Sequence, residues 1–178
     1  GYIIPAANMS TRKVDGNITY TAQWSASAVD VTFHANAVDG SGAAFSDGQT
    51  EKTFSNAYSS TMAFADVPVP VRTGYTFKGW VTSADGTGQT QSGSFTFDGQ
   101  VKDYYAQWEA TQVTVTFNPN GGTATDPTSF TLSYGENHPA SIPSVTMAGS
   151  QLAYWLDMES GAKYAQQADE DEGIQALS

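Results

Sequence analysis

Residues 104–108 read Tyr-Tyr-Ala-Gln-Trp, and residues 20–24 read Tyr-Thr-Ala-Gln-Trp, so this aromatic stretch occurs twice in the chain. The second copy lies 84 residues after the first, and the Val-Thr-Phe of residues 31–33 returns at residues 115–117 with the same spacing. Between residues 20–39 and residues 104–123, 10 of 20 aligned positions are identical without a gap. The chain is therefore predicted to contain one structural unit used several times in tandem.

The repeated unit reads mainly as short strands. Residues 29–33 alternate apolar and polar side chains, which is the period of a half-buried strand, and residues 113–117 repeat this alternation. Asn, Asp and Gly then mark turns at residues 36–42 and 120–122. Further strands are predicted at residues 52–55, 75–77, 94–97, 104–108 and 130–133, with a β-bulge at Gly79.

Residues 56–65 differ from the rest of the unit. Tyr58, Met62 and Ala65 follow one another at spacings of four and three, which predicts a short helix that Pro68 and Pro70 would end. With 17 glycines, 9 tyrosines and 9 phenylalanines, the composition favours strands and turns over long helices. The predicted fold class is therefore mainly β, in an α+β arrangement with one short helix.

The repeat divides the chain into three parts. Residues 29–112 form a complete unit, residues 1–28 correspond to the C-terminal part of a preceding repeat, and residues 113–178 form a further repeat that is truncated or divergent at its C-terminal end. Only four residues separate Trp24 from Val29, and four separate Trp108 from Val113. Links this short restrict motion between neighbours, so we expect small β-rich units in a semi-rigid, elongated array.

The charge and composition exclude several classes of function. The 178 residues include 18 acidic and 7 basic side chains, giving a net charge of -11, and no run of Lys or Arg is present to neutralise phosphates. Binding to nucleic acid or to an anionic membrane is therefore not expected. No apolar stretch is long enough to insert directly into a membrane, and the chain contains no cysteine.

Three motifs, taken together and in this order, carry a family resemblance. They are Pro-Val-Arg-Thr-Gly-Tyr-Thr-Phe-Lys-Gly-Trp at residues 70–80, Tyr-Tyr-Ala-Gln-Trp at residues 104–108 and Val-Thr-Phe-Asn-Pro-Asn-Gly-Gly-Thr at residues 115–123. As a set they resemble the Listeria/Bacteroides-type repeat, the B repeat of internalin-like bacterial surface proteins. The third copy departs from the pattern, with Tyr154-Trp155 in place of Gly-Trp, and the middle copy replaces Asn-Gly-Gly by Asn-Ala-Val-Asp-Gly at residues 36–40.

The resemblance implies a β-grasp-like unit, in which a few strands curl around one short helix, in a secreted protein attached to the cell wall. It implies no catalytic residues and no cofactor. The expected role is therefore that of a non-catalytic stalk, spacer or adhesin segment at the extracellular surface. Its expected partners are the neighbouring repeats of the same chain and an extracellular protein or glycan.

Large aromatic side chains at alternate positions are predicted to pack the core of each unit rather than to stack on sugars. These predicted core residues are Phe33, Tyr75, Phe77, Trp80, Tyr104, Trp108, Phe117 and Trp155.

Acidic, glycine-rich loops provide the only candidate metal ligands, because carboxylate oxygens suit calcium. The candidates are Asp39, Asp85, Asp169 and Asp171. The loop at residues 169–173 has too few residues before its glycine for an EF-hand and lacks the distal Glu. Solvated turns are therefore the preferred interpretation, and no metal is predicted.

Catalytic chemistry has little support in this sequence. His34 and His138 are the only histidines, and no nucleophile elbow, phosphate loop or metal-ligand spacing accompanies them. An amide cross-link from a buried lysine would suit a cysteine-free extracellular rod, and the candidates are Lys13, Lys52, Lys78, Lys102 and Lys163. The alternation of its strand predicts that Lys78 points to solvent.

Two alternatives to a plain stalk remain open. In the first, a unit binds a glycan or protein through the loops in which the copies differ, at residues 40–52 and 157–173. In the second, the aromatic strand at residues 20–24 completes the third unit of another molecule by strand addition.

Overall fold

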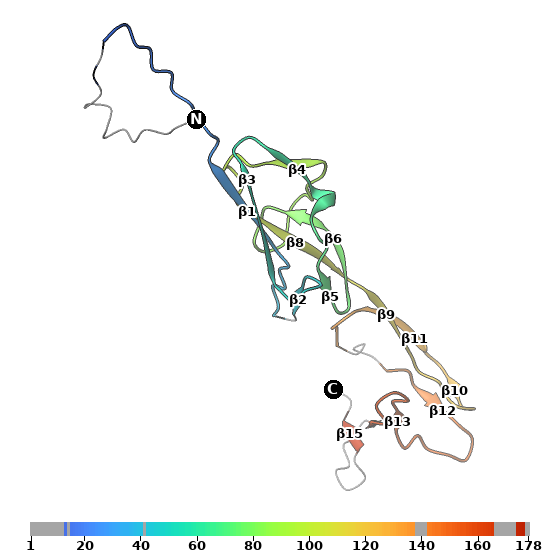
Figure 1. Cartoon of the computed structure of the whole chain (residues 1–178). Helices are drawn as coiled ribbons and strands as arrows, with labels where there is room; N and C mark the ends of the chain where they lie inside the picture. The colour runs from blue at the N-terminus through green and yellow to red at the C-terminus, as the bar shows by residue number, and fades with distance from the viewer. Residues whose placement is uncertain (1–12, 14, 41, 138–141, 166–173, 177–178) are drawn as a thin grey trace.

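The computed structural model describes residues 13, 15–40, 42–137, 142–165 and 174–176, and nearly all of its regular structure is β-strand (Figure 1). This confirms the predicted mainly-β class. The strands extend along one direction, with the complete unit followed by the smaller strand pairs of the next one.

A four-stranded sheet forms the complete unit. Its order is β3 (Glu51–Ala57), β1 (Ala28–His34), β8 (Asp103–Ala110) and β6 (Tyr75–Val81). β1 is antiparallel to β3 but parallel to β8, and β6 is antiparallel to β8. The strand from the end of the unit therefore lies in the middle of its sheet.

Two short strand pairs cover this sheet and complete its core. β2 (Ala43–Ala44) pairs with β5 (Val71–Arg72), and β4 (Thr61–Ala63) pairs with β7 (Ser94–Thr96). The segments that contain them bring Ala43, Phe45, Phe95 and Phe97 into the buried cluster.

The helix predicted over residues 56–65 is wrong. β3 runs to Ala57, Thr61–Ala63 form β4, and only a single 3₁₀ turn follows, η2 (Phe64–Asp66). The cause is tertiary: Met62 pairs with Phe95 across the β4–β7 ladder, and the Phe64 amide donates to the Gly93 carbonyl at 3.0 Å. The backbone groups that a helix would bond internally are thus used by a neighbouring strand.

The bulge predicted at Gly79 is confirmed. The β6–β8 register shifts between Phe77 and Gly79, where the backbone has φ +138°. A Cβ at Gly79 would lie 2.9 Å from the Thr90 methyl group, so the position has no room for a side chain. The extra residue resets the alternation, and Trp80 is buried with only 3% of its surface exposed.

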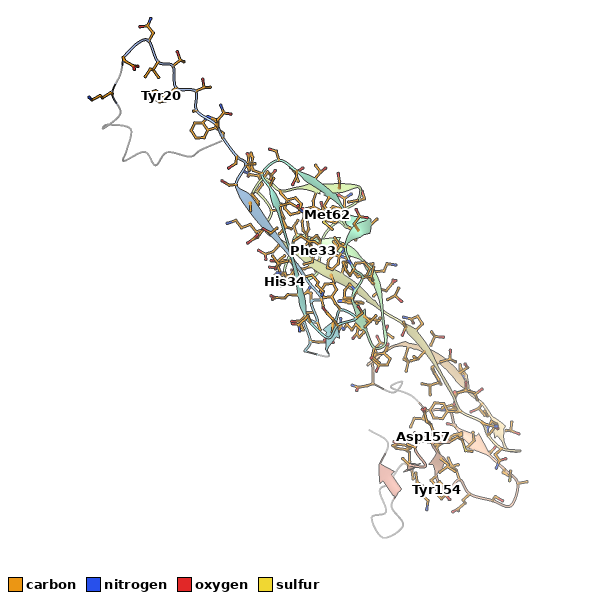
Figure 2. The ribbon with its side chains drawn as sticks, in the orientation of Figure 1. Tyr20, Phe33, His34, Met62, Tyr154 and Asp157 are labelled. Carbon is orange, nitrogen blue, oxygen red and sulfur yellow. The ribbon has the colours of Figure 1, made fainter. Side chains whose placement is uncertain are left out.

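Phe33 is the centre of the core (Figure 2). Its ring stacks on Tyr104 at 5.1 Å, meets Trp80 edge-on at 4.8 Å and meets Phe54 edge-on at 5.8 Å. Tyr104 is buried too, and the loss of hydration raises the pKa of its phenol. Such offset and edge-on contacts are the arrangements that aromatic rings prefer.

The following repeat contains shorter strands. β9 (Gln112–Thr116) pairs with β11 (Ser129–Ser133), and β10 (Thr123–Ala124) pairs with β12 (Val145–Thr146). A small sheet follows, in the order β13 (Trp155–Leu156), β14 (Lys163–Ala165), β15 (Ile174–Ala176).

The aromatic geometry of the complete unit recurs in this repeat. Phe117 meets Phe130 at an interplanar angle of 88° and Trp155 at 75°. The corresponding angles of Phe33 are 85° with Phe54 and 74° with Trp80. Trp155 therefore occupies the place of Trp80 although its motif lacks the preceding glycine.

Replacing Phe33 with Ala should lower the free energy of unfolding of the complete unit by about 3–5 kcal/mol, because it empties the centre of a closed aromatic cluster. Urea unfolding followed by tryptophan fluorescence measures the loss. The matched control is Phe117→Ala, which removes the equivalent ring from the more open cluster and should cost less. Equal losses would contradict the central role of Phe33.

Candidate functional site

The junction between the two repeats is formed by one nearly continuous strand. β8 ends at Ala110, β9 begins at Gln112, and Thr111 alone lies between them. The two strands run on in nearly the same direction (Figure 1). At about 3.3 Å per residue, the combined strand spans roughly 45 Å, so the joint contains no flexible linker.

Gly74 and Thr111 connect the two repeats through their backbones. The Gly74 carbonyl accepts two hydrogen bonds from Thr111, one from its amide and one from its hydroxyl, each 2.9 Å long. The Thr111 carbonyl in turn accepts a 2.8 Å hydrogen bond from the Tyr134 amide. Thr111 is thus bonded on one side to the complete unit and on the other to the β11 end of the next repeat.

The Tyr134 ring fills the space that a side chain at residue 74 would need. A Cβ at Gly74 would lie 2.1 Å from the Tyr134 ring, and Gly74 has φ +76°. The same ring meets Tyr75 edge-on at 5.9 Å. Only glycine combines this backbone conformation with so close an aromatic contact.

Tyr75 belongs to this junction, whereas the sequence prediction placed it in the core. It is half-buried, lies outside the core cluster, and has the Arg72 guanidinium 3.5 Å from its ring centroid. Arg72 donates to Asp39 at 2.5 Å, so the ring is held between a fixed cation and Tyr134. The remaining predicted core residues divide by exposure: Phe33, Trp80 and Tyr104 are buried, and Phe77, Trp108, Phe117 and Trp155 are half-buried.

His34 makes a polar bridge that no sequence motif predicted. Its Nδ1 lies 3.0 Å from Glu51 and its Nε2 lies 2.8 Å from Asp103, while its ring stacks on Tyr105 at 4.6 Å. The three partners come from β3 and β8, which flank β1. Each ring nitrogen faces a different carboxylate, an arrangement that ties three strands together on the outer face of the sheet.

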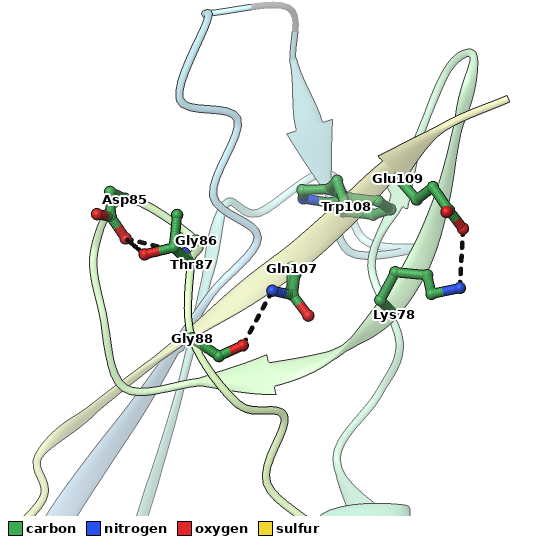
Figure 3. A pocket seen from close by; sticks show the side chains of 8 residues that line it. All are labelled: Lys78, Asp85, Gly86, Thr87, Gly88, Gln107, Trp108 and Glu109. Atoms are coloured by element: carbon green, nitrogen blue, oxygen red, sulfur yellow. Dashed lines mark hydrogen bonds and ion pairs between the residues drawn. The ribbon is translucent and has the colours of Figure 1, made fainter. Parts of the chain in front are cut away.

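A shallow, open depression of about 510 Å³ lies beside β6 and β8 (Figure 3). Its walls are Lys78, Asp85, Gly86, Thr87, Gly88, Gln107, Trp108 and Glu109. Its polar side chains bond to one another or to nearby backbone: Lys78 pairs with Glu109 at 2.8 Å, and Gln107 donates to the Gly88 carbonyl at 3.2 Å. The indole of Trp108 donates to the Ala35 carbonyl at 2.9 Å.

Asp85 closes its own loop through one of its carboxylate oxygens. One of its oxygens accepts hydrogen bonds from the Ser83 hydroxyl, the Thr87 amide and the Thr87 hydroxyl, at 2.6, 2.8 and 2.7 Å. These bonds, that from Ser83 foremost, lower the pKa of Asp85 to about 2. Asp39, the other described calcium candidate, pairs with Arg72, and Asp169 and Asp171 lie outside the described residues.

The described residues offer no assembled metal-binding group. Within them, no three His, Cys, Asp or Glu side chains are gathered as a metal ion would require. His138 lies outside the described residues, and Lys78 is exposed as its strand alternation predicted. None of the described residues belongs to a helix that is long and apolar enough to cross a membrane.

Gly74→Ala should lower the stability of the junction by more than the strain of its left-handed backbone alone would cause. Gly48→Ala is the matched control, because Gly48 has a similar φ of +81° but an added Cβ there would meet nothing within 4 Å. We expect Gly48→Ala to cost about 1–2 kcal/mol of stability, and Gly74→Ala to cost more. Gly74→Ala alone should also speed hydrogen exchange at the Thr111 and Tyr134 amides. Equal exchange in the two variants would contradict the packing of Tyr134 on Gly74.

The stability of the folded Asp85 loop should depend on pH only under acidic conditions. Because its pKa is lowered from 3.8 to about 2 in the folded chain, the hydrogen bonds of its carboxylate favour the folded loop above pH 4 and are lost as the pH falls through 2. Carbon-detected NMR titration of the Asp85 carboxyl measures this, and Ser83→Ala should raise the midpoint. A midpoint near 3.8 in the unmodified chain, or a shift of the Asp85 signal on adding millimolar calcium, would contradict the closed loop.

Comparison with known proteins agrees with this architecture. Residues 29–102 and 114–174 match the Listeria-Bacteroides repeat domain. Two proteins of Evansella cellulosilytica are similar to this chain: one, whose name describes a Gly-rich membrane protein, is 37% identical over 106 residues, and another, named as a membrane protein, is 33% identical over 105 residues. Each alignment covers 58% of this chain but only 12% and 15% of the respective relative. No solved structure matches the chain.

The two matched segments cover most of the chain and follow the repetition seen in its strands and aromatic clusters. The chain therefore belongs to the Listeria-Bacteroides repeat domain family, as the sequence resemblance predicted.

Proposed function

We propose that this chain is a semi-rigid segment of the stalk of a bacterial surface protein, which holds other parts of that protein away from the cell wall. The observation that carries the proposal is the junction at Gly74, Thr111 and Tyr134. Its backbone hydrogen bonds and its aromatic contact fix the direction of one repeat relative to the next. A spacer needs this property, whereas a set of independent binding modules does not.

The family supports an extracellular, cell-wall location, because this repeat is typical of bacterial surface proteins. Two relatives carry names of membrane proteins and are much longer than the matched region, which fits a repeat used as one part of a large surface protein. A non-enzymatic role is supported by the structural use of the polar side chains: His34, Asp85 and Lys78 all bond to neighbouring protein groups.

A binding role through the variable loops has weaker support. Residues 40–52 include Ala43 and Phe45, which are buried in the core and cannot face a partner, whereas residues 46–51 are exposed. The depression around Trp108 is shallow, and the polar groups in its walls already have protein partners. Loss of a measured glycan or protein interaction on changing the exposed residues of these loops would be needed to favour this role.

Small-angle X-ray scattering of the whole chain tests the stalk. A compact globule of this length would have a radius of gyration of about 16 Å, and we expect a clearly larger value with the pair-distance profile of an elongated particle. Tyr134→Ala should broaden that profile by loosening the junction, whereas Tyr58→Ala, at the other end of the complete unit, should leave it unchanged. A value near 16 Å for the unmodified chain would refute the proposal.

A further inference from the structure

The complete unit carries, at its opposite end, a second copy of the surface that forms the junction. In the junction, β11 ends at Ser133, Tyr134 follows, and Gly135 turns the chain with φ +83°. At the other end β3 ends at Ala57, Tyr58 follows, and Ser59 turns the chain with φ +68°.

The hydrogen bonds of the two turns correspond one to one. The Tyr134 amide donates to Thr111 at 2.8 Å, and the Tyr58 amide donates to Ser27 at 2.8 Å. The residue after each left-handed position closes the turn. The Glu136 amide donates to the Ser133 carbonyl, and the Ser60 amide donates to the Ala57 carbonyl, both at 3.0 Å. The backbone that presents Tyr134 to Gly74 is therefore already formed around Tyr58.

The side chains that the junction uses also correspond. Ser27 takes the place of Thr111 in the 84-residue repeat, so it keeps the hydroxyl that donates to Gly74 in the observed junction. Ala26 takes the place of Ala110, which pairs with Tyr75. These matches lie in the residues that touch the neighbouring repeat, where surface positions would otherwise be free to vary.

The two surfaces differ in the exposed fraction of their aromatic side chains. The Tyr134 ring lies against Gly74 and is 42% exposed, whereas Tyr58 is 56% exposed. Trp24 is 92% exposed, although its counterpart Trp108 lies 5.7 Å from Phe77 in the complete unit. Both aromatic side chains are thus more exposed at this end than their counterparts in the observed repeat.

We infer that Ser27 and Tyr58 form a preassembled docking surface for the Gly-aromatic turn of a preceding repeat in the same protein. The turn must resemble residues 73–75 (Thr-Gly-Tyr). Its glycine leaves room for the Tyr58 ring, its carbonyl accepts from Ser27, and its aromatic residue meets Tyr58 edge-on. This inference rests on the proposed stalk function and extends the observed junction to the other end of the unit.

An extended chain tests the inference, in which residues 25–108 occur twice in succession. There the second Ser27 follows the first Gly74 at the spacing that Thr111 has in the present chain, and the second Tyr58 lies 68 residues after the first Gly74, against 60 for Tyr134, because the loop between the paired strands is eight residues longer. Because the chain has no cysteine, an introduced pair gives an unambiguous disulfide. The Tyr134 Cγ lies 2.3 Å from the Cβ position of Gly74, which puts the two Cβ atoms within roughly 4 Å, as a disulfide requires.

The positive control is Gly74→Cys with Tyr134→Cys in the present chain, which should close on mild oxidation. The test pair is the first Gly74→Cys with the second Tyr58→Cys in the extended chain, and we expect it to close to a similar fraction within one molecule. The first Gly74→Cys with the first Tyr58→Cys is the negative control. A test pair that stays reduced while the positive control closes, or that closes only between molecules, would overturn the inference.

Urea unfolding gives an independent measurement that needs no cross-link. Tyr58→Ala in the second copy of the extended chain should lower the midpoint, as we expect Tyr134→Ala to do in the present chain, whereas Tyr58→Ala in the first copy should leave it unchanged. Equal effects of the two substitutions would count against the docking surface. The scattering profile of the unmodified chain would remain elongated in that case, so failure here is distinguishable from failure of the stalk proposal.

Discussion

The structure depends on where the last strand of the complete unit lies. β8 enters the sheet between β1 and β6, parallel to one and antiparallel to the other. A parallel neighbour needs a long crossover, and here the rest of the unit supplies it. The core therefore closes only when Tyr104 and Ala106 arrive from the end of the unit. Because β8 then leaves the sheet in the direction of its own axis, the strand that completes one repeat also sets the direction of the next.

The two aromatic clusters show which part of the core is local. Phe33 with Phe54 and Trp80, and Phe117 with Phe130 and Trp155, have nearly the same ring angles. Among the described residues, nothing stacks on Phe117 as Tyr104 stacks on Phe33. In the complete unit, the contacts with Phe54 and Trp80 come from β3 and β6, whereas the stacked contact with Tyr104 comes from the central strand β8. Phe117 is accordingly half-buried, and its repeat has shorter strands.

Several features could be predicted from the sequence because they depend on local periodicity and on the repeat itself. The alternation at residues 29–33, the bulge at Gly79 and the mainly-β class follow from side-chain spacing and from glycine's conformational freedom. Met62 shows where such reasoning fails. Its spacing from Tyr58 and Ala65 fits a helix, but pairing with Phe95 makes a strand, because backbone hydrogen bonds to a distant segment outweigh a weak local preference.

The sequence alone determined the family, the period of the repeat and some of the aromatic core residues of the complete unit, among them Phe33, Trp80 and Tyr104. It determined them because identity at a fixed spacing and alternation along a strand are properties of the chain itself. Only the tertiary structure decided that Tyr75 belongs to the junction, that His34 bridges Glu51 and Asp103, and that Tyr134 covers Gly74. Each of these contacts joins segments far apart in the chain, and their distances follow from strand order and register, which no local pattern encodes.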